Sequence, residues 1–145
     1  MNTRTIFFVF LTLMLWGVIP IFDKLALDTK RIPPIIGICL RISAAVIVLA
    51  PLLLTMPQLR EGWSALSLRQ GLAFAASGII SLVIAQYFYY EALKGSQVSR
   101  LFPLLFGGAP VVTMILGWLF LGETITAATA TGGLLITFGS ALMFL

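Results

Sequence analysis

The chain has 145 residues, of which 60% are hydrophobic and 10% are charged, and its formal net charge is +4. A soluble domain carries about a quarter charged residues, so this chain could not cover a soluble surface with polar groups. A lipid bilayer removes that need, and the composition therefore predicts an integral membrane protein. Five spans of about 20 residues use about 100 residues, so we expect one domain over residues 1–145 and no separate soluble domain.

The basic residues lie singly at the ends of apolar runs, where they suit anchoring to lipid headgroups and contact with membrane lipid. We therefore expect no nucleic-acid partner. The sequence has no histidine and a single cysteine, Cys39, which lies inside an apolar run. No acid–base, nucleophile or metal-ligand cluster is visible, so we predict neither an enzyme nor a metal or cofactor site.

The first apolar run predicts a transmembrane helix over residues 5–25, with Trp16 and Pro20 inside it. Arg4 ahead of an apolar run has the general shape of a signal peptide, but no small-x-small cleavage site follows. We expect this helix to be retained, with a kink at its proline. The polar residues 28–31 predict the first loop.

The second helix is expected over residues 33–56, because Pro33 and Pro34 suit the first turn of a helix. Residues 57–67 form the longest predicted connection and could form a short interfacial piece. The third helix is expected over residues 68–93.

The fourth helix is expected over residues 99–121 and the fifth over residues 126–145, which makes an all-α membrane protein of five spans. Gly95 is positioned to end the third helix in a left-handed conformation. Ser99 and Thr126 are candidate caps of the fourth and fifth helices.

Residues 107–110, Gly-Gly-Ala-Pro, weaken the centre of the fourth helix. Interrupted spans are typical of transporter binding sites, and a packing kink explains the sequence equally well. The fifth helix carries small residues at four-residue spacing, including Gly133 and Thr137. Such residues allow helices to approach closely in lipid.

The basic residues divide almost evenly between the two predicted sides of the membrane. One side holds Arg4, Arg60 and Arg69, and the other holds Lys24, Lys30, Arg31, Lys94 and Arg100. This small excess fits a modest preference for an outside N-terminus. It also fits insertion in both orientations followed by antiparallel pairing, as in transporters built from inverted repeats.

A polar and aromatic wall is predicted in the second half of the third helix. Tyr87, Glu91 and Lys94 share one helix stripe, and Gln86 and Tyr90 lie on the adjacent stripe. A substrate cavity needs a few oriented polar groups on an apolar lining, so these residues are candidates for substrate binding. The alternative is an interfacial ion pair between the glutamate and the lysine, beside an interfacial belt of tyrosines.

Two candidates lie outside this wall. Arg41, about two turns into the second helix, could snorkel, neutralise Glu91 or meet an anionic substrate. Trp16 could line the same cavity, although ordinary packing explains it as well.

These residues together resemble an EamA-type domain of the drug/metabolite transporter superfamily. The first part of the resemblance consists of Trp16, Gly17, Lys24, Pro34 and Arg41, and the second of residues 90–95, Ser99, Arg100, Pro103, Pro110, residues 120–124, Thr126, Gly132 and Gly139. The Leu-Gly-Glu turn at residues 121–123, after a proline-containing helix, is the most specific piece. Glu123 in that turn is expected to have a structural role at the helix junction.

The resemblance implies secondary transport of a small polar metabolite by alternating access, with Glu91 as a candidate proton-coupling group. Full-length members contain two such domains in inverted orientation, and this sequence is similar to one half-size repeat. An antiparallel homodimer, or a second half-size membrane subunit, in the bacterial or archaeal cytoplasmic membrane is therefore expected. The competing hypothesis is a non-transporting assembly subunit that packs against a partner membrane protein.

Overall fold

The computed structural model describes residues 2–27 and 32–143. The predicted first loop at residues 28–31 and the last two residues of the predicted fifth helix, 144–145, lie outside the described residues. Within the described ranges the secondary structure is helical, without a strand. The prediction of an all-α chain is thereby confirmed for this part of the protein.

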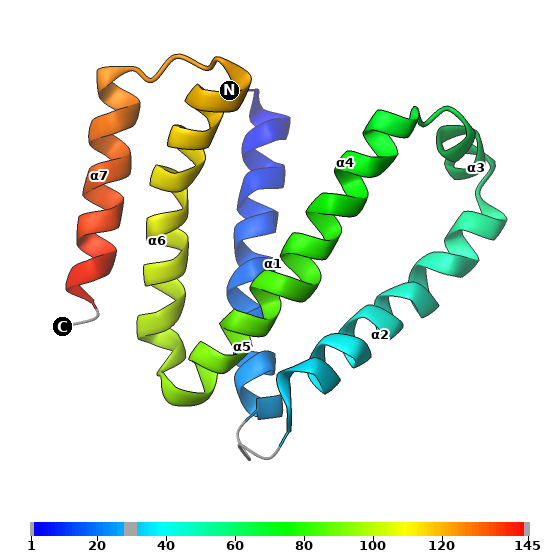
Figure 1. Cartoon of the computed structure of the whole chain (residues 1–145), viewed down its shortest axis with the longest axis horizontal. Coiled ribbons are helices and arrows are strands. Elements are labelled where there is room, and N and C mark those ends of the chain that lie inside the picture. Colours follow the sequence, from blue (N-terminus) through cyan, green and yellow to red (C-terminus); the bar gives the residue numbers. More distant parts are fainter. Residues whose placement is uncertain (1, 28–31, 144–145) are drawn as a thin grey trace. The chain divides into compact units, whose positions relative to one another are not determined.

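The chain divides into two compact units, of which the first comprises Met1–Lys24 and Gly95–Leu145. Its elements are most of α1 (Thr3–Leu27), α6 (Val98–Leu116), the π-helix η2 (Gly117–Leu121) and α7 (Ala127–Leu142). Within this unit α6 and α7 lie side by side as a helical hairpin (Figure 1).

Small residues bring α6 and α7 into close contact. Gly107 of α6 is buried, and a Cβ atom there would collide with the side chain of Ser140 in α7. The hydroxyl of Thr137 donates to the carbonyl oxygen of Gly107 at 2.6 Å. Gly133 faces Met114, whose terminal methyl carbon would lie 2.5 Å from an added Cβ. The close packing predicted for the fifth helix is confirmed, and α6 is continuous through its glycine- and proline-rich centre.

The turn between α6 and α7 has the features of a helix junction. Thr126 caps α7, since its side chain accepts the N–H of Thr129 at 3.1 Å, as predicted. Gly122 ends η2 in the left-handed region with a φ of 66°. The Gly117 carbonyl accepts the N–H groups of both Gly122 and Glu123, which closes the end of this helix.

The predicted capping of the turn before α6 is wrong. Gly95 is the last residue of α5, and Gly122 is the glycine with positive φ among the described residues. The N-cap of α6 is Gln97, so Ser99 lies inside the helix. A distant contact stabilises this turn instead, because the Lys24 ammonium donates to the carbonyl oxygen of Ser96 at 2.9 Å.

The second unit comprises Leu25–Lys94. Its elements are α2 (Pro34–Thr55), α3 (Pro57–Ser64), α4 (Leu68–Gly78), the π-helix η1 (Ile79–Ile84) and α5 (Ala85–Gly95). Pro34 opens α2 with Pro33 at the N-cap, as the sequence predicts. The last three elements form one continuous helix of 28 residues, Leu68–Gly95. It contains a π-turn, in which the N–H of Ala85 bonds to the carbonyl of Ile80.

Four helices are long and apolar enough to cross a membrane: Thr3–Leu27, Pro34–Thr55, Leu68–Gly95 and Val98–Leu121. Most of their apolar side chains face outward, for example Leu40 at 71% and Phe120 at 80% exposure. Lipid satisfies such surfaces, so the chain is a multi-pass membrane protein. The fifth apolar helix, Ala127–Leu142, has 16 residues and is about 24 Å long, compared with about 30 Å for the hydrocarbon layer. Five membrane spans therefore stay a prediction.

Candidate functional site

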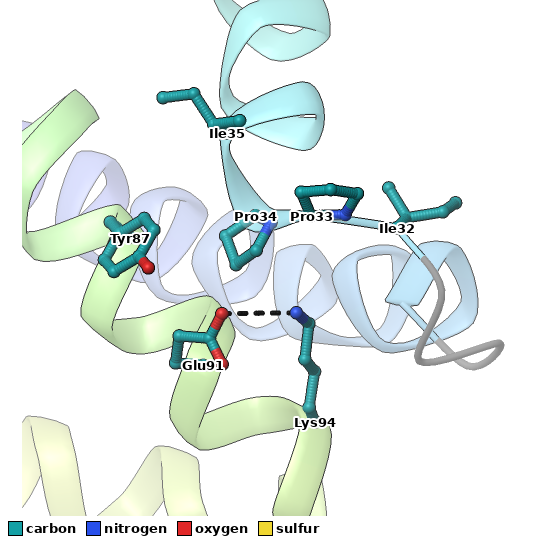
Figure 2. Close-up of a pocket in the computed structure, with 7 residues that line it drawn as sticks. All are labelled: Ile32, Pro33, Pro34, Ile35, Tyr87, Glu91 and Lys94. Carbon is teal, nitrogen blue, oxygen red and sulfur yellow. Dashed lines mark hydrogen bonds and ion pairs between the residues drawn. The ribbon is translucent and has the colours of Figure 1, made fainter.

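The second unit contains an open cavity of about 400 Å³ between the start of α2 and the end of α5 (Figure 2). The described residues that line it are Ile32, Pro33, Pro34, Ile35, Tyr87, Glu91 and Lys94. The structure thus places the predicted stripe of the third span along one wall. The opposite wall comes from a segment more than 50 positions earlier in the sequence, so tertiary packing creates the cavity.

The charged part of the wall is an ion pair within α5. Lys94 Nζ lies 3.2 Å from Glu91 Oε1, and the two side chains are 18% and 46% exposed, respectively. On a helix surface exposed to water, an ion pair at this spacing contributes only about 0.2–0.5 kcal/mol. A ligand with its own charged or hydrogen-bonding groups can therefore replace this contact at a small energetic cost.

The opposite wall is apolar and stiff. Pro33 and Pro34 have no backbone N–H, and their rings fix φ. Pro34 is buried at the first turn of α2, while Ile35 is exposed. The cavity thus combines one rigid apolar side with one side that offers a carboxylate, an ammonium group and the phenol of Tyr87. This combination can hold a small polar molecule in a defined orientation.

Tyr90 packs the two helices together and does not line this cavity. The tyrosine is 4% exposed, and a Cβ atom on Gly37 of α2 would lie 3.0 Å from its Cε2 atom. Leu93 of α5 and Ile38 of α2 are also buried, at 0% and 2% exposure. Because Gly37 has no side chain, the ring of Tyr90 in α5 can lie directly against α2.

Gln86 is half-buried, and its Nε2 atom is buried without a hydrogen-bond partner among the described residues. A buried donor without a partner costs about 1–3 kcal/mol. The amide is therefore a donor that a water molecule or a ligand would stabilise. Arg41 is half-buried in α2, and neither residue lines the cavity described above.

Trp16 belongs to the first unit, whereas the other five candidate residues belong to the second. Its side chain is 51% exposed, and its ring centroid lies 5.7 Å from that of Phe106 in α6. The ring of Phe106 in turn contacts that of Phe102 in a tilted arrangement, with ring centroids 4.3 Å apart. Trp16 thus extends an aromatic cluster between α1 and α6.

The proline wall is the part of the site that sequence reasoning did not find. The sequence predicts only a helix start at Pro33 and Pro34. A usable signal was present, because successive spans cross the membrane in alternating directions. The start of the second span and the end of the third must then reach the same membrane surface, where their side chains can meet.

A second cavity, of about 590 Å³, lies in the first unit at the turn before α7 and is lined by Trp118, Gly122, Glu123, Thr124 and Ile125. The Glu123 carboxylate folds back over Gly117, where an added Cβ would lie 2.7 Å from Oε2. Its backbone N–H also bonds to the Gly117 carbonyl at 3.2 Å. These contacts agree with the structural role expected for Glu123 at the helix junction.

The described residues contain no group of three or more His, Cys, Asp or Glu side chains that could hold a metal ion. A comparison with protein-family models matches residues 3–145 to the EamA-like transporter family. Comparisons with curated proteins and with solved structures gave no match.

Proposed function

This chain belongs to the EamA-like transporter family, and we propose that it moves a small polar metabolite across the membrane by alternating access. The observation that carries this proposal is the cavity of α2 and α5. It presents the Glu91–Lys94 pair and Tyr87 within a chain whose surface is otherwise strongly apolar. Glu91 and Lys94 lie within a candidate membrane span, and ionisable residues inside the membrane are costly and usually face a cavity, a partner or a substrate.

The proposal assigns direct substrate contacts to Tyr87 and Glu91. Gln86 is added because its buried amide has a free donor, and Arg41 because it is an ionisable residue within a membrane span. We keep Tyr90 and Trp16 as candidates for the lining in another state of the transport cycle, since alternating access changes which side chains line the pathway. Glu91 is the proposed proton-coupling group.

Transport is tested by reconstituting the protein in vesicles that contain a pH-sensitive dye. A panel of amino acids, nucleotide-linked sugars, vitamins and cationic drugs is then applied outside. We expect at least one compound to drive proton movement, and Glu91→Gln to abolish it. Glu61→Gln in α3 is the matched control, because this exposed glutamate lies outside the cavity. An unchanged proton flux in Glu91→Gln would remove the coupling role.

The ion pair raises a competing explanation for any loss in Glu91→Gln. Removal of one charge leaves Lys94 without its partner, which could disturb the site by itself. The double variant Glu91→Gln/Lys94→Gln restores the charge balance. We expect it to stay uncoupled if Glu91 carries the proton. Recovery of proton flux would show that the glutamate only balances the lysine.

We propose that the chain is a single transport domain that works as an antiparallel homodimer in a bacterial or archaeal cytoplasmic membrane. Support comes from the family, the short connections and the near balance of basic residues on the two sides. Reporter fusions at both termini test this. A mixed population of orientations supports the symmetric pair, and a single orientation excludes it and requires a second half-size subunit.

A non-transporting assembly subunit is the second candidate, since the outward apolar surfaces could also be covered by another membrane protein. Labelling by a water-soluble thiol reagent distinguishes the two, in a background where Cys39 is replaced by serine. Tyr87→Cys, at 42% exposure in the cavity, should be labelled in a transporter. The buried Ile38→Cys, at a position with 2% exposure, serves as the protected control. Protection at both positions favours the assembly subunit.

A further inference from the structure

The connection between the second and third spans forms an amphipathic helix. α3 covers Pro57–Ser64, and its two large apolar residues, Leu59 and Trp63, lie four positions apart. They are 40% and 70% exposed, and at 3.6 residues per turn they fall within a sector of about 40°. The residues just outside the helix, Met56 before it and Leu66 after it, are also apolar and are 44% and 39% exposed. Leu59 and Trp63 form an apolar stripe of α3 with no cover in the described structure.

The opposite side of α3 is polar. Gln58, Glu61 and Ser64 lie outside the apolar sector, and all three are exposed. Glu61 lies about 180° from the centre of the stripe at 100° per residue. The segment also has balanced charge, with one arginine and one glutamate in residues 57–67. A surface of this kind fits a boundary between water and hydrocarbon, and it gives no preference for an anionic partner.

The connections of α3 restrict where it can lie. Met56 is both the C-cap of α2 and the N-cap of α3, so no flexible linker separates these helices. Ser67 caps α4 through the N–H of Gln70, only three residues after α3 ends. Both neighbouring helices have the length and composition of membrane spans. α3 must therefore remain at the surface of the bilayer.

The spans on either side of α3 also carry exposed apolar residues next to it. Leu54 near the end of α2 is 79% exposed, and Leu68 at the start of α4 is 80% exposed. From the stripe, the balanced charge and the two short connections, we infer that α3 lies in the headgroup–acyl boundary with Leu59 and Trp63 inserted among the lipid chains. In this position α3 anchors the C-terminal end of α2 and the N-terminal end of α4. These are the helix ends that lie farthest in sequence from the cavity. This inference does not depend on transport activity.

Single-cysteine scanning tests this placement without a substrate. Residues 58–66 are replaced one at a time by cysteine in a Cys39→Ser background, spin-labelled and reconstituted in phosphatidylcholine vesicles. Collision rates with oxygen, which concentrates in lipid, and with a water-soluble nickel chelate are then measured. We expect the spin label at Leu59→Cys to lie about 5–10 Å deeper in the bilayer than the label at its neighbour Gln58→Cys. Along the scanned residues, the depth of the label should vary with a period near 3.6 residues. Anionic phosphatidylglycerol should leave these depths unchanged.

Two outcomes would overturn the inference. Access of the nickel chelate to every position would show that α3 stands in water. Protection of the stripe from both reagents would show that a protein surface, such as a second copy of this chain, covers it. If the labelled variants do not fold, Trp63 fluorescence provides the same information in Trp16→Phe/Trp118→Phe. Lipids brominated near the headgroup should then quench it more strongly than lipids brominated at the chain ends, and the reverse order refutes the placement.

Discussion

Replacement of Gly107 by alanine probes the tightest helix contact in the first unit. The new methyl group would overlap the Cβ and Oγ atoms of Ser140 and lie 3.3 Å from the carbonyl oxygen of Ile136. The serine cannot rotate away freely, because its hydroxyl donates to that same carbonyl at 2.8 Å. The two helices must therefore separate. Overpacking of this kind costs about 1–3 kcal/mol of unfolding free energy.

The next residue supplies a matched control. Gly108 has no atom within 4 Å of an added Cβ, so Gly108→Ala creates no overlap. Both substitutions have the same gain in helix propensity, about 1 kcal/mol in soluble helices. The difference between their unfolding free energies thus isolates the packing cost at Gly107. We expect this difference to be about 1–3 kcal/mol.

A second substitution should reverse the effect. Ser140→Gly removes both overlapping atoms, so Gly107→Ala should cost little in that background. The double-mutant cycle is expected to give a coupling energy of about 1–3 kcal/mol. Unfolding by dodecyl sulfate in mixed micelles, followed by circular dichroism, measures each free energy. Equal stability of Gly107→Ala and Gly108→Ala, or no recovery with Ser140→Gly, would refute the α6–α7 contact described above.

Three further changes test other contacts by the same unfolding measurement or by hydrogen exchange. Thr137→Val removes the 2.6 Å bond to the Gly107 carbonyl and should cost about 0.5–2 kcal/mol, whereas Thr137→Ser should be nearly neutral; equal losses would contradict the bond. Gly37→Ala should lower stability by about 1–3 kcal/mol, because its methyl meets the Tyr90 ring at 3.0 Å, and an unchanged unfolding curve would argue against this packing. Ser67→Ala removes the cap of α4 and should cost about 1 kcal/mol, seen as faster amide exchange in the first turn; unchanged protection would exclude the cap.

Features set by local chemistry could be predicted from the sequence. The start of α2 at Pro34 follows from the fixed φ of proline, and the cap at Thr126 from a hydroxyl that accepts a nearby N–H. The long apolar runs predicted five spans, and the structure shows four helices that are long enough for spans. Such signals depend only on residues within a few positions of each other.

Features set by distant contacts could not be predicted. The turn after α5 needs no left-handed Gly95, because Lys24 binds the Ser96 carbonyl from 72 positions away. The π-turn of η1 likewise has no local signal, since its sequence is a uniform apolar run. Tertiary packing decides both features, and neither leaves a pattern in the residues nearby.

In the candidate site, too, the features set by local spacing could be predicted, and the features set by distant contacts could not. Helix spacing correctly placed Tyr87, Glu91 and Lys94 on one stripe, which the structure finds in one cavity. Helix spacing alone could not separate Tyr90, which packs against Gly37, from residues that line the cavity. That distinction depends on where α2 lies beside α5.

The π-turn of η1 has a consequence for the direction in which this stripe points. An i→i+5 bond encloses one more residue than an α-turn, and each residue advances a helix by about 100°. The α5 side chains are therefore out of phase with α4 by roughly that angle, compared with an uninterrupted α-helix. Closure of this π-turn into an α-turn, at the same sequence length, would rotate α5 by that angle. It would turn Tyr87 and Glu91 away from the proline wall while both ends of the span remain at the membrane surfaces. Deletion of one residue from Ile79–Ile84 would instead remove the extra residue of the π-turn and leave the direction of Tyr87 and Glu91 unchanged. A change of turn type in the middle of a span, without any change in sequence length, is thus a route by which this cavity wall can be re-aimed.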